Sequence, residues 1–285
     1  MTPPPHDAHA ARPEGTPASR SATDPLPPGL EVVILAGGLG TRLSEETSAR
    51  PKPMVEIGDR PILHHLMEIY SAQGVDHFVI ALGYLGHIIK HYFVDLTTLA
   101  GDLRIDMRES RIERRPFLRR PWSVELVETG ARTETGGRLK RVGSHLQRRT
   151  FMLTYGDGLA DVDLAALLAS HRRHGKLATL TAVHPPARFG ELDLDGDRVE
   201  RFEEKPQVRE GWINGGFMVL EPEVLDRIAG DETVLERDVL ARLAADGELM
   251  VYRHDGFWQC MDTLRDVRTL TALWEGGSPP WVRRP

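Results

Sequence analysis

Residues 31–54 constrain the fold of this chain more than any other segment, and they read EVVILAGGLGTRLSEETSARPKPM. The apolar run 32–35 shows no polar alternation, which is typical of a parallel strand buried on both faces. It leads into three glycines, which let backbone amides approach a ligand closely. Arg42 and Lys52 then add two positive charges, and prolines on both sides of Lys52 restrict its backbone. The segment predicts a phosphate-binding loop at the end of a buried strand.

The spacing of these glycines excludes two common phosphate loops. A dinucleotide-binding loop needs a third glycine where this chain has Leu43, which disfavours a dehydrogenase-type domain. A Walker loop needs Gly-Lys-Ser or Gly-Lys-Thr, and neither follows Gly40. A plain glycine-rich turn with a solvated lysine is the simplest alternative. Arg42 and the proline-bracketed Lys52 favour the phosphate site over that alternative.

The composition limits the class of protein and its partners. A chain of 285 residues with 40% hydrophobic and 27% charged residues can bury a full core as a soluble protein. Its net charge of −6 argues against nucleic acid or an anionic membrane as the main partner. The chain has a single cysteine and no apolar run of the roughly 18 residues that cross a bilayer. These features predict a cytoplasmic protein.

The chain divides into a tail and one domain. Residues 1–30 are rich in Pro, Ala and Ser, which predicts a disordered tail without the apolar run of a signal peptide. In residues 31–285, buried strands such as 77–82 and 151–155 alternate with amphipathic helices. This rhythm predicts an α/β fold with a Rossmann-like, mixed but mostly parallel sheet flanked by helices. A hairpin with an Asp-Gly turn is predicted at 190–199.

Several polar residues follow predicted strands or open predicted helices. Asp157 lies between two glycines after the strand 151–155, where open α/β sheets place ligands, although an Asx-type turn is the alternative. Residues 133–137 open a helix whose free amides would bind a base or a phosphate, unless this is an ordinary capped helix start. Asp262 precedes the last helix, 264–274, and would serve equally as its N-cap.

Two further features leave alternatives open. The segment 108–120 contains six arginines, a pattern typical either of a solvent-exposed segment outside the core or of a subunit contact. His64 and His65 lie on a predicted helix, and no second cluster of ligands accompanies them. Packing is therefore favoured over metal binding for these two histidines.

Taken in order, the motifs resemble those of the sugar-1-phosphate nucleotidyltransferases over most of residues 30–282. The similar segments are LAGGLGTRLSEET, PKPMVEIG, TGGRLKRV, TYGDG, PPARFG, EKP, INGGF, FWQ and MDTLRD. TGGRLKRV and MDTLRD are similar to the branch that uses CTP. The resemblance implies a magnesium-dependent transfer of CMP from CTP to glucose 1-phosphate, which gives CDP-glucose and pyrophosphate for nucleotide-sugar and lipopolysaccharide biosynthesis. It also implies a Rossmann-like fold and a homo-oligomer, with hexamers familiar in this branch.

The same resemblance implies roles for individual residues. The nucleotide and its phosphates are expected on Leu35, Ala36, Gly37, Gly38, Leu39, Gly40, Thr41, Arg42, Lys52, Thr133, Gly136, Arg138 and Gly156. Magnesium is expected on Asp157 and Asp262, and the sugar phosphate on Glu204, Lys205 and Asn214. Catalysis is expected to depend on Arg42, Lys52, Asp157 and Asp262. Two positions depart from the family pattern, Leu85 in place of a usual Lys and Cys260 in place of a usual Pro, and neither removes a ligand.

The implied chemistry needs no general base. A sugar 1-phosphate already carries close to two negative charges at neutral pH, because the second pKa of a phosphate monoester is about 6. Its obstacle is the approach to another polyanion, which cations and oriented amides overcome. Two alternatives remain: the same transfer from UTP, dTTP or GTP, and a catalytically silent sugar-nucleotide sensor. A sensor would be expected to lose one of the four charged catalytic candidates, and all four are present.

Overall fold

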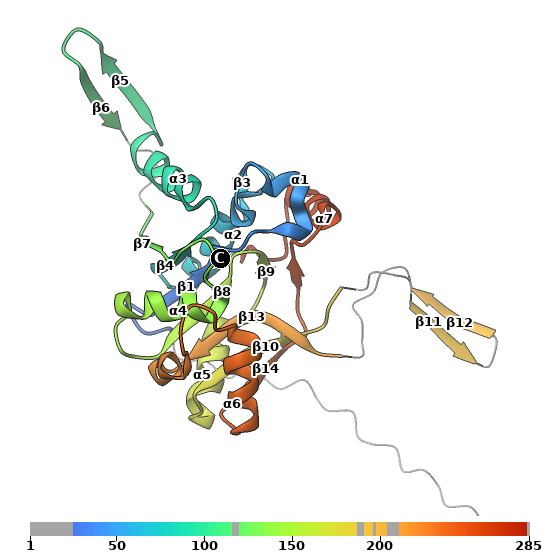
Figure 1. Cartoon of the computed structure of the whole chain (residues 1–285). Coiled ribbons are helices and arrows are strands. Elements are labelled where there is room, and N and C mark those ends of the chain that lie inside the picture. Colours follow the sequence, from blue (N-terminus) through green and yellow to red (C-terminus); the bar gives the residue numbers. More distant parts are fainter. Residues whose placement is uncertain (1–24, 116–119, 187–190, 196–197, 204–210, 284–285) are drawn as a thin grey trace, which may run out of the picture.

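The computed structural model describes residues 25–115, 120–186, 191–195, 198–203 and 211–283. At its centre is a seven-stranded sheet in the order β14-β10-β13-β8-β1-β4-β7 (Figure 1). The strands are β1 (Glu31–Leu35), β4 (His77–Leu82), β7 (Ser123–Glu128), β8 (Phe151–Tyr155), β10 (Ala178–Val183), β13 (Ile213–Leu220) and β14 (Leu249–His254). Only β13 runs antiparallel to its neighbours in this sheet. The predicted mixed, mostly parallel sheet is confirmed.

Helices cover both faces of the sheet, because the central strands are apolar on both sides. In β1, Val32 and Ile34 join one core, whereas Val33 and Leu35 join the other. The first core is completed by α2, α3, α5 and α7, and the second by α4 and α6. The helices are α1 (Ser44–Thr47), α2 (Ile62–Ser71), α3 (Gly86–Thr98), α4 (Thr135–Val142), α5 (Leu164–His174), α6 (Ala241–Ala245) and α7 (Leu264–Glu275).

Two helical segments of the second half of the chain are not regular α-helices. Residues 222–227 form a 3-10 helix, η4 (Pro222–Arg227). Further along, a π-helical turn, η5 (Leu235–Leu240), leads directly into α6. Apolar spacing alone does not distinguish these helix types, since their hydrogen-bond patterns depend on tertiary contacts at the helix ends.

Four two-stranded sheets surround the central one. They are β2 (Glu56–Ile57) with β3 (Arg60–Pro61), β5 (Asp102–Asp106) with β6 (Arg111–Arg115), β9 (Gly158–Ala160) with β15 (Trp258–Cys260), and β11 (Glu191–Asp195) with β12 (Arg198–Glu203). β11 and β12 confirm the hairpin predicted at 190–199, whose turn lies outside the described residues. The β5–β6 and β11–β12 hairpins both stand away from the body (Figure 1).

The predicted tail is only partly described. Residues 1–24 lie outside the described residues. In the remaining part, Leu30 is buried in the first core and Leu26 packs against that core. Residues of the packed structure therefore begin before residue 31, where the tail was predicted to end. Among the described residues, no helix combines the length and the apolar character that a membrane crossing requires.

Candidate active site

The predicted phosphate loop lies at the carboxyl edge of the sheet, where β1, β4 and β8 end. The amide of Ala36 donates to the carbonyl of Ala81 over 3.1 Å, and the amide of Gly156 donates to the carbonyl of Leu35 over 3.0 Å. The loop is thereby tied to both neighbouring strands. Within it, Gly40 has a left-handed φ of 65°, which glycine adopts without steric strain.

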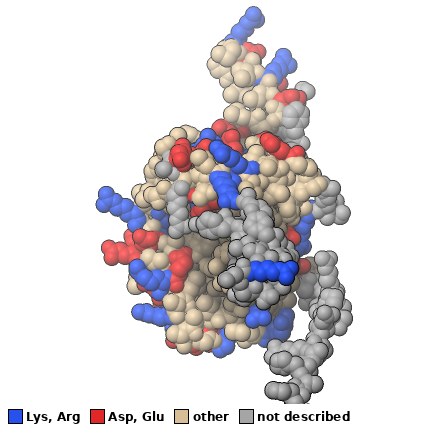
Figure 2. Space-filling view, turned by 90° about the vertical axis from the view of Figure 1, so that its right-hand side faces the viewer, with Lys and Arg blue, Asp and Glu red and all other residues tan. Residues whose placement is uncertain are grey.

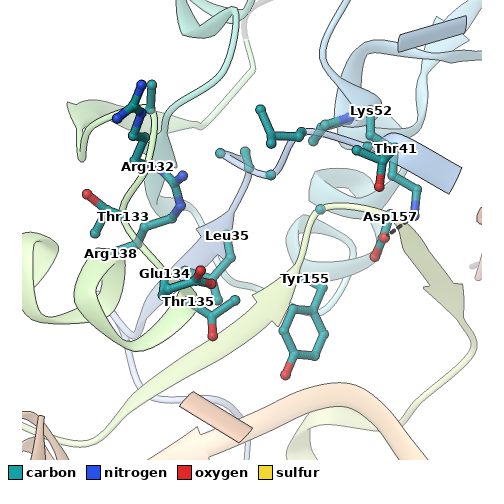
Figure 3. A pocket seen from close by; sticks show the side chains of 18 residues that line it. Leu35, Thr41, Lys52, Arg132, Thr133, Glu134, Thr135, Arg138, Tyr155 and Asp157 are labelled. Carbon is teal, nitrogen blue, oxygen red and sulfur yellow. Dashed lines mark hydrogen bonds and ion pairs between the residues drawn. The ribbon is translucent and has the colours of Figure 1, made fainter. Parts of the chain in front are cut away.

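A pocket of about 380 Å³ opens between this loop and the start of α4 (Figure 3). Its volume lies within the range of about 300–1,000 Å³ that is usual for small-molecule sites. The predicted site residues that line it are Leu35, Ala36, Gly37, Gly38, Leu39, Gly40, Thr41, Lys52, Thr133, Arg138, Gly156 and Asp157. In Figure 3 the side chains of Thr133 and Arg138 lie at one side, and those of Lys52 and Asp157 lie at the other. Cationic groups therefore flank the pocket at both sides.

Lys52 joins the two aspartates that were predicted to hold the metal. Its Nζ atom lies 2.6 Å from Oδ2 of Asp157 and 2.6 Å from Oδ1 of Asp262. The two carboxylates thus meet at one cation, although they are separated by more than one hundred residues in the sequence. Lys52 begins the short 3-10 helix η2 (Lys52–Met54), which the prolines on both sides hold in place.

The small sheet of β9 and β15 explains why the two aspartates meet. Gly158 pairs with Cys260 in this sheet, and Asp157 and Asp262 lie just beyond that pair. The amide of Met261 also donates to the carbonyl of Asp157 over 2.8 Å. The strand pairing therefore brings the aspartate that follows β8 next to the one that follows β15.

The alternative role of Asp262 as an N-cap is wrong. Thr263 is the N-cap of α7, and it forms a capping box with Asp266. The backbone amide of Asp262 donates to the carboxylate of Asp266 over 3.0 Å, which leaves the Asp262 side chain directed at Lys52. Sequence spacing could not distinguish two adjacent capping candidates, because Asp and Thr are both good N-caps.

Burial and charge act in opposite directions on Lys52. Burial disfavours the ammonium ion, but the two aspartates outweigh burial and raise the pKa of Lys52 above its usual value. Lys52 is thus a stable cation at physiological pH. Burial raises the pKa of the neighbouring Cys260 thiol to about 12, and the aspartates add to this effect. Cys260 is therefore a protonated thiol and a poor nucleophile.

The donor set at Lys52 fits a magnesium ion. Two carboxylates converge on one positive charge, and hard oxygen donors are the ligands that Mg²⁺ prefers. The described residues contain no group of three or more His, Cys, Asp or Glu side chains able to hold a metal. Two carboxylates suit Mg²⁺ in particular, since it commonly keeps several waters and takes its remaining ligands from substrate phosphates.

Arg138 is a buried cation at the opposite side of the pocket. Its Nη1 donates to the carbonyls of Leu82 and Gly130 and to the hydroxyl of Thr129, over 2.7–3.1 Å. Burial lowers the pKa of Arg138 below its usual value. A Cβ atom on Gly37 would lie 2.2 Å from this Nη1, so any larger residue there would have to displace the Arg138 guanidinium. Arg138 therefore ties α4 to the ends of β4 and β7, and its guanidinium lies close to Gly37 of the glycine-rich loop.

The start of α4 differs from the prediction. It was expected to present free amides, but the amides of Gly136 and Gly137 both donate to the carbonyl of Thr233, over 2.9 and 3.2 Å. A Cβ atom on Gly136 would lie 2.7 Å from that same carbonyl oxygen. Gly136 thus lets α4 pack against the chain that precedes η5, and it does not line the pocket. This close approach is a tertiary contact that the sequence motif does not reveal.

The remaining predicted residues are placed less completely. Arg42 belongs to η1 (Thr41–Leu43), the turn that ends the glycine-rich loop. Glu204 and Lys205 lie outside the described residues. Asn214, near the start of β13, donates its amide nitrogen over 3.4 Å to the hydroxyl of Tyr155, which lines the pocket.

Sequence reasoning missed a polar network centred on Glu236. The hydroxyl of Tyr155 donates to Oε1 of Glu236 over 2.5 Å, and the hydroxyl of Thr135 donates to Oε2 over 2.8 Å. Tyr155 and Thr135 both line the pocket. Burial raises the pKa of Tyr155, and the Glu236 carboxylate raises it further. No sequence signal marked Glu236, because it lies within a segment that reads as an amphipathic helix.

The fold and the site together define a class of nucleotide-binding α/β proteins, with a glycine-rich loop, flanking cations and paired aspartates at the carboxyl edge of the sheet. More narrowly, the chain belongs to the nucleotidyl transferase family, whose model matches residues 31–278. The predicted family resemblance is thereby confirmed.

Individual relatives agree with this assignment. A glucose-1-phosphate cytidylyltransferase of Salmonella typhi is 51% identical over 253 residues, which cover 88% of this chain and 98% of that protein. A mannose-1-phosphate guanyltransferase beta-B of Xenopus laevis is 30% identical, over 84% of this chain and 63% of that protein. The crystal structure of HddC from Yersinia pseudotuberculosis superimposes with a TM-score of 0.63 at 25% identity, over 86% of this chain and 99% of that one.

Proposed function

We propose that this protein transfers CMP from CTP to the phosphate of glucose 1-phosphate, giving CDP-glucose and pyrophosphate. The observation that carries the proposal is the convergence of Asp157, Asp262 and Lys52 beside the pocket of the glycine-rich loop. The choice of CTP and glucose is supported by the Salmonella typhi relative, whose 51% identity far exceeds the 30% of the guanyltransferase.

The proposed mechanism brings two polyanions together without a general base. The amides of the glycine-rich loop and Lys52, which line the pocket, bind the triphosphate. From the family resemblance, we assign Arg42 to the same phosphates. Asp157 and Asp262 would hold Mg²⁺, which would supply Lewis-acid polarisation of the α-phosphate. From the family resemblance, we assign Glu204, Lys205 and Asn214 to the binding of glucose 1-phosphate, whose dianionic phosphate is already a nucleophile. Thr133 and Arg138 form the nucleotide side of the pocket.

The remaining features of the proposal concern the whole protein. Residues 31–285 form one catalytic domain and residues 1–30 a tail. We propose a cytoplasmic homo-oligomer, with hexamers as the arrangement familiar among similar proteins, that binds neither nucleic acid nor membranes as its main partner. Its product serves nucleotide-sugar synthesis for surface polysaccharides such as lipopolysaccharide.

A nucleotide-choice assay tests this function. The purified protein is offered CTP, UTP, dTTP or GTP with glucose 1-phosphate and Mg²⁺, and the release of pyrophosphate is measured. We expect release with CTP and at most slow release with the others. Equal or faster release with another triphosphate would assign a different base, and no release with any of them would favour a silent sensor. Mannose 1-phosphate with GTP is the informative control, because it pairs the substrates named for the more distant relative.

A further inference from the structure

Two histidines of α3 differ from the other histidines that the structure describes. The exceptions are His87 and His91, whose ring nitrogens have no hydrogen bond or ion pair within the described ranges. Every other histidine in those ranges forms one through a ring nitrogen, and these are His64, His65, His77, His145, His171, His174, His184 and His254. The nitrogens of His87 and His91 are therefore free to bind a ligand.

The helix places these two side chains next to each other. α3 lies at the margin of the body, between β4 and the β5–β6 hairpin (Figure 1). It buries Ile89 and Phe93, whereas His87 and His91 are exposed. Residues four apart are neighbours on one helix face, and the two ring centroids lie 6.0 Å apart with the planes at 81°.

This separation suits two imidazoles that share one metal ion. A tetrahedral ion bound to two ring nitrogens at about 2.0–2.1 Å places the ring centres about 5 Å apart. The two rings of α3 reach that distance by a small rotamer change, since exposed side chains interconvert between rotamers within nanoseconds. The pair is therefore preorganised for chelation by the helix itself.

The nearby charges permit a cation at this place. Lys90 lies between the two histidines in sequence, but its Nζ is 2.6 Å from Oε1 of Glu128, which offsets its charge. Asp95 is exposed one turn beyond His91 on the same side of the helix. These carboxylates oppose the positive end of the α3 dipole, which disfavours a cation at His87.

The donor type decides the class of ion. Basic and acidic side chains are interspersed on the face shown in Figure 2, without the broad surface of one sign that attracts a polyelectrolyte. Free imidazoles instead select ions such as Zn²⁺, Cu²⁺ and Ni²⁺, whereas Mg²⁺ prefers oxygen donors. Because the described residues form no group of three or more such ligands, water must complete the coordination. An ion held by two protein ligands exchanges more readily than one held by four.

We propose that His87 and His91 form a second metal site, which binds one divalent transition-metal ion such as Zn²⁺ and clamps the first two turns of α3. These turns follow Leu85, whose left-handed φ of 51° is uncommon outside glycine. The amide of Tyr84 donates to the carbonyl of Gly37 over 3.2 Å, so the clamp supports the segment that holds the glycine-rich loop. The proposal is independent of the transfer reaction, since neither histidine lines the pocket.

Zinc binding to the full chain tests the proposal without any substrate. Protein freed of metal by chelation is titrated with Zn²⁺ in a calorimeter, in an excess of Mg²⁺ that competes for the oxygen-donor site. His87→Ala and His91→Ala should each weaken the binding of one zinc ion at least about tenfold. His145→Ala is the matched control, since His145 is 36% exposed but paired with Glu125, and it should bind as the wild type does. A wild type that binds no zinc, or α3 variants that bind it equally well, overturns the proposal.

Thermal unfolding tests the clamp itself. An ion that binds the folded helix and not the unfolded chain stabilises the fold by mass action. Saturating Zn²⁺ should therefore raise the unfolding temperature of the wild type and of His145→Ala more than that of His87→Ala. Equal shifts in all three proteins would overturn the clamp.

Cobalt spectroscopy shows where the ion lies. His91→Cys replaces one imidazole by a thiolate, which is also a ligand for these ions. With Co²⁺ in place of Zn²⁺, this variant should show the charge-transfer absorption of a cobalt-bound thiolate, and the further substitution His87→Ala should remove it. The wild type is the control, since its single Cys260 is half-buried and protonated. Absence of the absorption from the His91→Cys variant contradicts a metal site on α3.

Discussion

At the residue scale, Lys52 and the two aspartates form the electrostatic centre of the site. The Lys52 ammonium lies 2.6 Å from a carboxylate oxygen of each aspartate, and its side chain is only 13% exposed. In such a partly desolvated setting, opposite charges interact more strongly than at the surface. The loss of any one of the three charges should therefore change the turnover rate and the pKa values of the other two groups.

Lys52→Ala should lower the rate of pyrophosphate release by about two to four powers of ten, the scale for the loss of one electrostatic stabiliser of a transition state. The assay is steady-state turnover with saturating CTP and glucose 1-phosphate. Lys176→Ala is the control, because Lys176 is ion-paired with Glu248 and lies outside the pocket. Near-wild-type turnover in the Lys52 variant would remove this residue from the mechanism.

Asp262→Asn should raise the Mg²⁺ concentration that gives half-maximal activity. The expected increase is at least about tenfold, since even the loss of a supporting partner costs metal affinity about 10- to 100-fold. Chelation of the metal should stop the reaction of the wild type. Asp255→Asn is the control, because the Asp255 side chain is 80% exposed. A superimposable metal titration for the Asp262 variant would contradict its role as a ligand.

At the element scale, short irregular segments connect the sheet to the pocket. η5 is a π-helical turn, a type that is often found at functional sites, and it supplies Glu236. Glu236 accepts hydrogen bonds from Tyr155 at the end of β8 and from Thr135 at the start of α4. Asn214 of β13 approaches the same tyrosine hydroxyl. This network holds four elements in one arrangement around the pocket.

Glu236→Ala should lower kcat/KM for CTP by about one to two powers of ten, because small displacements of positioning groups are costly in catalysis. Circular dichroism and thermal unfolding show whether the variant is folded. Tyr155→Phe removes only one bond of the network and should have a smaller effect. Unchanged kinetics in the Glu236 variant would show that the pocket wall does not depend on this network.

Glu68 connects α2 to two arginines and gives the stability a predictable pH dependence. Burial alone would raise its pKa, but His64, Arg120 and Arg60 outweigh burial and lower it from 4.5 to about 2. Because the folded-state pKa is depressed, the stabilisation is complete well above pH 4.5 and is lost as the pH falls toward 2.

The difference in unfolding free energy between the wild type and Glu68→Gln should therefore fall by about 1–2 kcal/mol between pH 6 and pH 3. Urea unfolding at several pH values measures this difference. Glu125→Gln is a suitable control, since the Glu125 side chain is half exposed. A difference that does not change with pH would contradict the depressed pKa.

At the scale of the whole molecule, the stability of the domain depends on Leu30, the last residue of the predicted tail. Leu30 is 3% exposed and belongs to the core beneath β1. Leu30→Ala should lower the unfolding free energy by about 2–5 kcal/mol, the cost of truncating a buried leucine.

Deletion of residues 1–24 should leave both the unfolding free energy and the turnover unchanged. Loss of activity on that deletion would assign the tail a role in the reaction.

Much of the fold was predictable because its signals are local. Buried strands such as 32–35 and the helices between them follow from the distribution of apolar residues, and this alternation implies a largely parallel sheet. The antiparallel insertion of β13, the π-helical turn and the order of the strands were not predictable in this way. They depend on which strand edges and helix ends find hydrogen-bond partners in three dimensions.

The sequence by itself determined the strand, the glycine-rich loop and the charged residue types of the site, because loop flexibility and side-chain charge are properties of the residues present. Only the tertiary structure decided that Asp157 and Asp262 share Lys52, that Thr263 rather than Asp262 caps α7, and that the Gly136 amide is already bonded. In each case, ion-pair or hydrogen-bond partners compete that are either distant in sequence or equally suitable by residue type. Such a choice is made by packing and strand register, which become fixed only when the chain folds.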